Sequence, residues 1–529
     1  MKQHINSFVS WGLIVGLILL TCSCQMHAQE EKTKEERSLR AVWVTTVYQL
    51  DFPRITSRDP IAIKLQWDEL LKEIKKKGFN AIFFQVRPSG DAFYTSAFAP
   101  WSRFLTGEEG SAPFDNFDPL KYFIESAHDQ NVELHAWLNP FRAAINNDST
   151  TVHDQSHILI QKPEWCYQYG KRAYLDPGLP EVRRFLLQSI NELVENYELD
   201  GIHFDDYFYP YPIPGVSIPD TLSYSRLGGS FFDKSDWRRN NINEFIDATH
   251  QLIKQKKPYL RFGVSPFGVW RNEYEDQRGS KTKAIISSYD DLYTDVLEWI
   301  DKKWIDYVAP QLYWEIGNEN ADYEILLNWW NEYAKDRQLL IGHALYKVDT
   351  AAGNAWALPN EIPLQLKMSK DASQVVGNAF FRANYLLKGI LGIGDTIANL
   401  QKNLILPPVI ETQLALDIQN VNFRKPRWTK MGVELCWRMP ETGALPYYYA
   451  IYRFEGPNAE KDLKKGEVIH LSNWNAHEKA FCFYDKTIKQ NQYYTYQVIG
   501  LDRYHRLGQR SNEWSILKTE GKFTVDSEL

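Results

Sequence analysis

Eight short apolar runs recur between residues 40 and 405, and stretches with a helical period of apolar residues separate them. The first run is RAVWVTTV, and the others begin near residues 80, 132, 199, 260, 305, 339 and 377. Strand-like runs that are joined by helical crossovers form a parallel sheet, and eight of them can close into a barrel. An open, doubly wound sheet is the alternative, but no glycine-rich phosphate loop follows the first run. We therefore predict a (β/α)8 TIM barrel, of mixed α/β class, over residues 40–405.

Start and stop signals of helices occur between these runs. The dipeptide Asp-Pro stands at residues 59–60 and again at residues 118–119. Aspartate is a favoured N-cap and proline suits the first helical turn, so each dipeptide predicts a helix start. Gly78 then ends the first of these helices. Residues 289–303, YDDLYTDVLEWIDKK, also have a helical pattern.

The pattern changes after the segment LILPPVIE, residues 404–411. Short alternating runs follow, such as GVELCWRM, YYYAIYRFE, KAFCFYD and YYTYQVIG, and turn residues separate them. No long amphipathic helix occurs in this part of the sequence. The alternation predicts a small all-β sandwich of the immunoglobulin-like or fibronectin III-like kind over residues 412–520, with residues 406–411 as a linker.

The N-terminus has the features of an export signal. A lysine and a histidine precede the apolar run WGLIVGLILL, residues 11–20, which is short for a membrane span. Cysteines directly after it suggest a lipoprotein signal in residues 1–24: a leucine three residues earlier favours Cys22 as the lipidated residue, and a small preceding residue favours Cys24. Cleavage after Ala28 without lipidation is the alternative. Residues 25–39 would form a charged tether.

Composition narrows the function. The net charge of -7 and the pI near 6.0 argue against a nucleic-acid partner, because phosphate contacts need a basic face. The chain has 18 Trp, 30 Tyr and 27 Phe, which suits surfaces that stack on sugar rings as well as a large core. We expect membrane contact through the lipid anchor only, in an exported lipoprotein facing the periplasm or in the outer membrane of a Gram-negative bacterium.

Cysteine and histidine spacing predicts no metal and no cofactor. Cys166, Cys436 and Cys482 remain after processing, and their spacing matches no metal motif. Cys436 and Cys482 can form a disulfide in an oxidising compartment or stay as buried thiols. His153 and His157 have a ligand spacing for a helix, but no third ligand is near in the sequence.

The run LDGIHFDDYFYP ends in two adjacent carboxylates, Asp205 and Asp206. Chemistry in a TIM barrel occurs at the carboxyl ends of the strands. Side chains alternate along a strand, so Asp205 and His203 should face the barrel mouth while Phe204 faces the helices. Two carboxylates beside aromatic rings are what a glycosidase needs to protonate the leaving oxygen, to attack or activate water, and to hold sugars.

We expect Asp205 to act as nucleophile or base, and Asp206, Asp91 and Glu315 are the candidates for the second catalytic group. An ion pair of Asp205 with Arg87 or Arg142, and a helix cap by Asp206, are the structural alternatives. The histidines can orient substrate or be satisfied core groups. The candidate substrate-binding residues at the strand ends are Arg87, Trp101, His135, Trp137, Asn139, His203, Tyr207, Gln311, Tyr313, Trp314 and His343.

Several long motifs resemble one family. RAVWVTTV, FNAIFFQVRPSGDAFYTSAFAPWSRFLTG, HAWLNPFR, LDGIHFDDYFYP and YVAPQLYW are similar to the glycosyl-hydrolase-like 10 family. The resemblance implies a TIM barrel and a glycoside hydrolase, and one such relative acts on peptidoglycan glycan strands without peptides. The C-terminal part is similar to fibronectin type III modules on such barrels in gut Bacteroidetes.

GIHFDD also resembles the fourth-strand motif of the alpha-amylase clan, in which Asp205 would take the place of the nucleophile. This chain departs from that clan, because His203 replaces an arginine and the fifth strand lacks the acid glutamate. Two functions remain open: a glycoside hydrolase that cleaves a polysaccharide or peptide-free peptidoglycan strands, and a surface lipoprotein that binds carbohydrate without catalysis. The sequence does not indicate the oligomeric state.

Overall fold

The computed structural model describes residues 37–148, 150–349, 354–415, 418–440, 442–459, 462–472 and 480–526. The expected signal sequence with Cys22 and Cys24, and all of the tether but its last residues, lie outside this part. In the part that is described, no helix combines the length and the apolar character that a membrane span requires.

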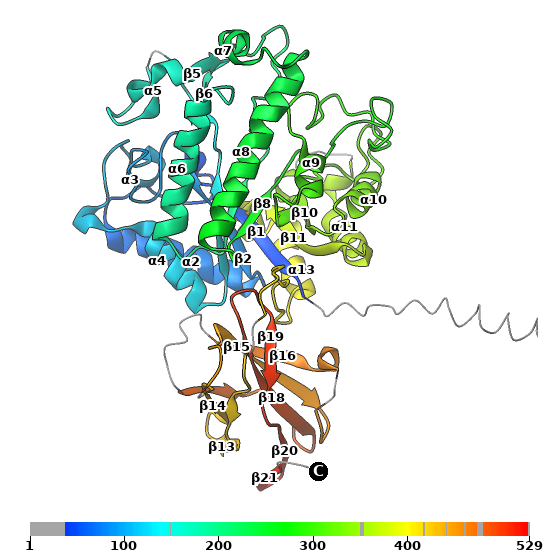
Figure 1. The fold of residues 1–529 in the computed structure, drawn as a ribbon. Coiled ribbons are helices and arrows are strands. Elements are labelled where there is room, and N and C mark those ends of the chain that lie inside the picture. The colour runs from blue at the N-terminus through cyan, green and yellow to red at the C-terminus, as the bar shows by residue number, and fades with distance from the viewer. Residues whose placement is uncertain are drawn as a thin grey trace, which may run out of the picture. The chain divides into compact units, whose positions relative to one another are not determined.

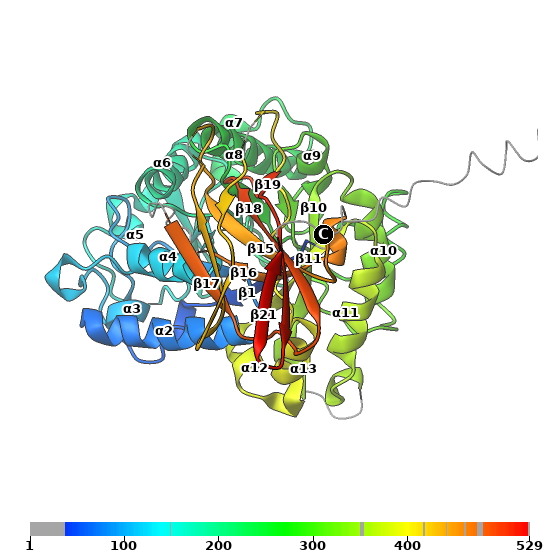
Figure 2. The same cartoon turned by 90° about the horizontal axis from the view of Figure 1, so that it is seen from below.

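Eight parallel strands close into a barrel, in the order β1-β11-β10-β9-β8-β7-β3-β2. This confirms the predicted TIM barrel, and Figure 2 shows the helices surrounding the strands. The strands are β1 (Leu39–Val44), β2 (Ala81–Arg87), β3 (Glu133–Leu138), β7 (Gly201–Phe204), β8 (Arg261–Val264), β9 (Tyr307–Val308), β10 (Gln338–Ala344) and β11 (Val375–Phe381).

Capping residues start the helices where the sequence indicates. Asp59 accepts the backbone N–H of Ile61 at 3.0 Å, and Asp118 accepts that of Leu120 at 3.1 Å. The helices, coloured blue to yellow in Figure 1, are α2 (Pro60–Lys76), α3 (Arg103–Thr106), α4 (Pro119–Asp129), α5 (Ile158–Gln161), α6 (Pro180–Asn196), α7 (Thr221–Leu227), α8 (Lys234–Lys256), α9 (Val296–Asp301), α10 (Tyr323–Tyr333), α11 (Glu361–Asp371), α12 (Ala383–Leu387) and α13 (Ile393–Leu400).

The helix that the pattern predicts over residues 289–303 is longer than the observed one, because only α9 (Val296–Asp301) is helical there. Side chains before α9 bond to the backbone and compete with helical hydrogen bonds. Asp291 accepts the N–H of Ser287 at 2.7 Å, and Ser287 Oγ accepts the N–H of Asp290 at 3.3 Å. These bonds hold a turn in place of the expected first helical turns.

Side-chain alternation along the strands separates an inner from an outer core. Ile202 and Phe204 of β7 pack in the outer core with the helices, while His203 lies inside the barrel. The inner layer is crowded: a Cβ on Gly201 would lie 2.3 Å from the His135 ring, and one on Gly263 would lie 2.1 Å from the Tyr307 ring. Glycine at these two strand positions therefore makes room for the rings that fill the barrel.

The C-terminal part consists of two antiparallel sheets with a shared apolar core. This arrangement fits a fibronectin-like module. Cys436 and Cys482 are directly paired across β14 and β17 and form a disulfide. The strands are β12 (Asn422–Phe423), β13 (Arg427–Thr429), β14 (Gly432–Arg438), β15 (Tyr448–Glu455), β16 (Glu467–Leu471), β17 (Ala480–Asp485), β18 (Tyr493–Leu501), β19 (Leu507–Arg510), β20 (Trp514–Thr519) and β21 (Lys522–Asp526).

A buried charge network lies at the amino ends of the barrel strands. Glu133 at the start of β3 pairs with Arg261 of β8 at 2.5 Å and with His505 of the C-terminal part at 3.1 Å. Arg261 also donates to the carbonyl of Pro408 at 2.6 Å. The Glu133 and Arg261 side chains are at most 1% exposed. The network joins the barrel floor to the segment that follows the barrel.

Candidate active site

A cavity of about 540 Å³ opens at the carboxyl ends of the barrel strands. The polar side chains in its wall include the two carboxylates that follow β7 and the side chains of two arginines and a lysine, and most of the other lining residues are aromatic. The lining residues are Trp43, Thr45, Val47, Tyr48, Leu50, Gln85, Trp137, Arg142, Ile145, Arg172, Asp205, Asp206, Tyr207, Tyr211, Ser265, Phe267, Gln311, Tyr313, Trp314, Tyr346, Lys347 and Phe381.

Asp205 and Asp206 are both buried in the cavity wall, with 4% and 3% exposure. Asp205 accepts hydrogen bonds from the Asn139 side-chain amide and, at 3.2 Å, from the backbone N–H of Tyr207. Asp206 accepts a hydrogen bond from the hydroxyl of Tyr211. Both carboxylates thus have defined partners and still line the cavity.

Burial and mutual repulsion shift the acidity of this pair. Burial and the charge of Asp206 raise the pKa of Asp205 to about 7, although Arg142 opposes the shift. Burial also raises the pKa of Asp206, against the hydrogen bond from Tyr211. Because the charge of Asp206 favours the protonated form of Asp205, ionisation of one group makes ionisation of the other harder. The pair can therefore present an acid and a carboxylate at the same time.

A chain of amides orients the carboxylate of Asp205. The backbone N–H groups of Thr46 and Val47 donate to Gln85 Oε1 at 2.9 and 3.0 Å. The amide nitrogen of Gln85 then donates to Asn139 Oδ1 at 2.7 Å, and this leaves the Asn139 amide nitrogen to face Asp205. The end of β1 thus sets the direction of a side chain at the end of β7.

Arg142 strengthens the same arrangement from the short strand β4 (Arg142–Ala144). It donates to Asn139 Oδ1 and to the carbonyl of Pro88, both at 2.7 Å. Its guanidinium lies 5.2 Å from the centre of the Tyr207 ring. Strand β4 pairs with β6 (Arg172–Leu175), which in turn pairs with β5 (Cys166–Tyr169), and β6 brings Arg172 to the cavity.

His203 lies beneath the carboxylates as a neutral ring. Its Nε2 accepts the indole N–H of Trp43 at 3.1 Å, because that N–H can only donate. The proton is then on Nδ1, which lies 2.9 Å from the hydroxyl of Tyr307. Burial holds the pKa of His203 well below its usual value. The ring therefore supports the site without carrying charge.

The aromatic wall is built from several strand ends. The Tyr313 and Phe381 rings stack with 6.1 Å between centres, and the Phe267 and Trp314 rings meet edge to face at 5.3 Å. Lys347 donates to the carbonyl of Tyr313 at 2.5 Å. Flat rings beside polar groups are suited to hold a sugar ring.

The structure brings seven of the predicted site residues to the cavity. These are Trp137, Asp205, Asp206, Tyr207, Gln311, Tyr313 and Trp314. Asn139 lies behind Asp205 as its hydrogen-bond donor. The other candidates do not line the cavity: Arg87, Asp91, Trp101, His135, His203, Glu315 and His343.

Four of these other candidates have hydrogen-bond partners outside the cavity lining. His135 bonds to Glu133 and Tyr307, and His343 bonds to Gln365 and Asn378. Asp91 is buried and accepts a hydrogen bond from Ser89 at 3.0 Å. The carboxylate of Glu315 accepts hydrogen bonds from Asn318 and Trp356, both at 2.9 Å. Arg87 is buried and Trp101 is half-buried.

Sequence reasoning missed part of the wall. The alternation of side chains along the first run could have indicated Trp43 and Thr45. Tyr211 follows the carboxylates closely in YFYPYP, but nothing in the sequence points its hydroxyl at Asp206. Arg172 reaches the cavity through the β5–β6 hairpin, and the sequence indicates Arg142 only as an ion-pair partner of Asp205.

A cavity of about 630 Å³ lies elsewhere, beside Tyr259, Tyr447 and Arg503. The guanidinium of Arg503 lies 4.6 and 4.4 Å from the two ring centres and pairs with Glu198 at 2.8 Å. The described lining of this cavity contains no two carboxylates that are neighbours in sequence. The pair of adjacent carboxylates is therefore a feature of the smaller cavity.

Comparison with known proteins identifies the family of this chain. The sequence matches the family described as glycosyl hydrolase-like 10 over residues 38–357. It is 38% identical over 518 residues to Glycosyl hydrolase YngK of Bacillus subtilis, across 95% of this chain and 97% of that protein. It is 34% identical over 413 residues to Glycosyl hydrolase DigH of Escherichia coli, across 71% of this chain and 93% of that protein.

Among solved structures, the glycoside hydrolase domain of PgaB from Bordetella bronchiseptica is similar with a TM-score of 0.44 and 13% sequence identity, covering 70% of this chain and 100% of that chain. The family match spans more than half of the sequence, and the two relatives match over most of their own length. The chain belongs to the glycosyl hydrolase-like 10 family.

Proposed function

We propose that the protein is an exported glycoside hydrolase that cleaves peptide-free peptidoglycan glycan strands. The observation that carries this proposal is the pair of buried, adjacent carboxylates, Asp205 and Asp206, in a cavity with aromatic walls. Because burial and the charge of Asp206 raise the pKa of Asp205 to about 7, Asp205 can protonate a leaving oxygen while Asp206 acts as the charged carboxylate. Membership in the glycosyl hydrolase-like 10 family supports the same chemistry.

The position of the two carboxylates favours a nucleophile supplied by the substrate. Both follow one strand, and the described cavity lining includes no third carboxylate from another strand. In the usual mechanism two carboxyl groups flank the scissile bond, but some glycosidases use the substrate itself. Peptidoglycan sugars carry a 2-acetamido group whose oxygen can attack the anomeric carbon as the bond to the leaving oxygen breaks. Water then opens the cyclic intermediate.

The pair would share the remaining tasks. One member donates its proton to the leaving oxygen and later takes a proton from the attacking water. The other, as a carboxylate, orients the acetamido N–H. Asp205, with the pKa that burial and Asp206 raise to about 7, is suited to the proton transfer. The nucleophile or base role expected from the sequence is the alternative for this residue.

Positively charged side chains in the cavity wall favour a peptide-free glycan strand as the substrate. Arg172 and Lys347 line the cavity together with Arg142. In peptidoglycan the lactyl carboxyl of muramic acid is an amide where a peptide is attached, and it becomes a free carboxylate when the peptide is removed. A charge-assisted hydrogen bond to this carboxylate would discriminate between the two forms of the strand.

The first test is a product screen with the wild-type full chain. Peptide-free strands, intact peptidoglycan and a panel of neutral polysaccharides are incubated with the protein, and the products are identified by mass spectrometry. We expect hydrolysed fragments from the peptide-free strands at the highest rate. Hydrolysis of a neutral polysaccharide alone would contradict the proposed substrate.

Replacement of Arg172 tests recognition of the free carboxylate. Arg172→Gln should lower kcat/KM on peptide-free strands by about 10-fold, the value of one charge-assisted hydrogen bond. Oligomers of N-acetylglucosamine, which lack the lactyl group, should be cleaved at an unchanged rate. Lys171→Gln is the matched control, because Lys171 neighbours Arg172 and does not line the cavity. An equal loss on both substrates would mean that Arg172 does not recognise the carboxylate.

Two observations support export. The N-terminal sequence resembles a lipoprotein signal, with Cys24 or Cys22 as the expected lipid attachment site. The disulfide between Cys436 and Cys482 suits an oxidising compartment. Labelling of cells with a radioactive or alkyne-modified fatty acid, followed by Cys22→Ala and Cys24→Ala, would identify the anchor. An unlabelled mature chain would favour cleavage after Ala28.

A surface lipoprotein that binds glycans without cleaving them is the second candidate. The observation that favours it is that the carboxylates in the described cavity lining, Asp205 and Asp206, both lie at the end of one strand. Measurable affinity for peptide-free strands without any product by mass spectrometry would support this candidate over the hydrolase.

A further inference from the structure

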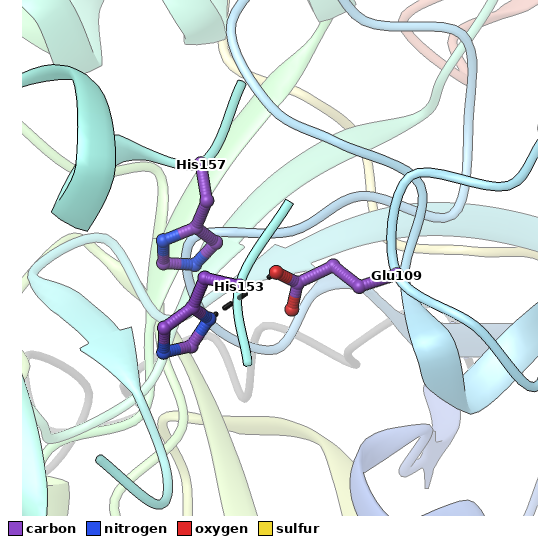
Figure 3. A group of neighbouring side chains, drawn as sticks. All are labelled: Glu109, His153 and His157. Atoms are coloured by element: carbon purple, nitrogen blue, oxygen red, sulfur yellow. Dashed lines mark hydrogen bonds and ion pairs between the residues drawn. The ribbon is translucent and has the colours of Figure 1, made fainter. Parts of the chain in front are cut away.

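We propose that Glu109, His153 and His157 form a zinc site outside the cavity. Glu109 lies in the loop after α3, and the two histidines lie in the segment between β4 and α5. Figure 3 shows the glutamate reaching toward the histidines, which lie one above the other. One potential ligand atom from each residue lies within 4.8 Å of the others. The sequence offered the two histidines alone, and the fold supplies the third group.

The hydrogen bonding around His153 is incomplete. Its Nδ1 lies 3.2 Å from Glu109 Oε1, but its Nε2 is buried and has no partner among the described residues. The side chains of His153 and Glu109 are each only 8% exposed. A buried polar atom without a partner in a native protein calls for an explanation, and an ion is one of the few available.

A tetrahedral ion would draw the three ligand atoms closer together. Two ligands of zinc with bonds of about 2.0–2.2 Å lie about 3.3–3.5 Å apart, whereas the potential ligand atoms here lie within 4.8 Å of one another. Two imidazoles and one carboxylate are a known zinc ligand set that leaves a position for water. Glu109 Oε2 accepts a hydrogen bond from Arg103 at 2.8 Å, and Oε1 accepts the backbone N–H of Asp154 at 2.9 Å, so zinc would compete with one of these donors.

Zinc binding would replace hydrogen bonds that the cluster now makes. His157 Nδ1 accepts the N–H of Leu159 at 3.2 Å, so the proton of the neutral ring is on Nε2. Coordination by either ring nitrogen would therefore break the Leu159 bond, directly at Nδ1 or by transfer of the proton from Nε2 to Nδ1. The His157 and His153 rings are stacked at 4.2 Å, and one of them has to rotate to direct both lone pairs at one ion. The ion would then tie the loop after α3 to the segment that continues from the cavity residues Arg142 and Ile145.

The test uses the full chain purified without a polyhistidine tag. After EDTA treatment, the protein is loaded with zinc sulfate, desalted, and analysed for metal by mass spectrometry. We expect about one zinc per chain in the wild type and at least about 10-fold weaker binding in Glu109→Gln and in His153→Asn. Less than about a tenth of a zinc per chain in the wild type would overturn the proposal.

His250→Asn is the matched control. His250 also has a buried ring nitrogen without a partner, but it belongs to no such ligand group in the part of the chain described. Its replacement should leave zinc binding unchanged. Full zinc retention in both Glu109→Gln and His153→Asn would mean that any bound zinc lies elsewhere.

X-ray absorption of the zinc-loaded wild type is independent of how the variants fold. We expect two imidazole ligands and oxygen ligands at about 2.0–2.2 Å. A spectrum with fewer than two imidazoles would overturn the proposal and leave the cluster as a hydrogen-bonded contact between two loops.

Discussion

Asp205→Asn should lower kcat on peptide-free glycan strands by about 10²–10⁴-fold, the range for loss of a general acid. Asparagine keeps the size of the side chain and can still meet the Tyr207 N–H, but it cannot transfer the proton to the leaving oxygen. The rate is measured from reducing ends released by equal amounts of folded wild-type and variant protein. Undiminished turnover would remove Asp205 from the mechanism.

The dependence on pH and on leaving group provides a second readout of the same change. Because an acid acts in its protonated form, and the pKa of Asp205 is raised to about 7 by burial and by Asp206, wild-type kcat should fall as the pH rises through about 7. Asp205→Asn should lack this alkaline limb. An aryl glycoside with a good leaving group needs less protonation, so its cleavage should suffer less in the variant.

Asp91→Asn and Glu315→Gln serve as controls for the choice of carboxylate. Neither residue lines the cavity, and both carboxylates have hydrogen-bond partners elsewhere. We expect both variants to keep kcat within a few-fold of the wild type. A loss with Glu315→Gln as large as that with Asp205→Asn would favour a two-carboxylate mechanism over participation of the substrate.

Glu133→Gln should lower the free energy of unfolding by about 3–5 kcal/mol, because it removes one charge of a buried pair and leaves Arg261 without its counterion. Glu133 and Arg261 are 2.5 Å apart and at most 1% exposed. Glu133 also contacts His135 and His505, so the change affects the barrel floor and its contact with the C-terminal part. Denaturation with urea, followed by tryptophan fluorescence, measures the effect.

The surface pair of Arg427 and Glu434 is the matched control. Its guanidinium nitrogen and carboxylate oxygen are also 2.5 Å apart, but the arginine side chain is 75% exposed. Glu434→Gln should cost less than about 1 kcal/mol, as exposed pairs do. The double variant Glu133→Leu with Arg261→Met removes both buried charges and should be less destabilised than Glu133→Gln. Equal effects of Glu133→Gln and Glu434→Gln would contradict the importance of burial.

The barrel was predictable from the sequence because its signals are local. Apolar runs and Asp-Pro starts such as Asp59-Pro60 depend on neighbours in the chain, and both agree with the structure. The wrong prediction of a helix over residues 289–303 also has a local cause. The side chains of Ser287 and Asp291 form hydrogen bonds with the backbone there and hold a turn. Strand alternation likewise placed Asp205 and Phe204 on opposite sides of β7.

The candidate site was only half predictable, because its remaining members come together through contacts between distant segments. Strand ends indicated Asp205, Trp137 and Tyr313 as neighbours. The strand ends could not indicate that the side-chain amides of Gln85 and Asn139 orient the carboxylate of Asp205. That contact depends on the register between β1, β2, β3 and β7.

The sequence by itself determined the closed barrel, the β-rich C-terminal part and the adjacent pair Asp205 and Asp206 at a strand end, because periodicity and spacing along the chain carry that information. Only the tertiary structure decided that Arg172 lines the cavity, that Cys436 meets Cys482, and that Glu109 meets His153. The physical reason is that such meetings depend on the paths of loops and hairpins, which packing sets and local patterns do not encode.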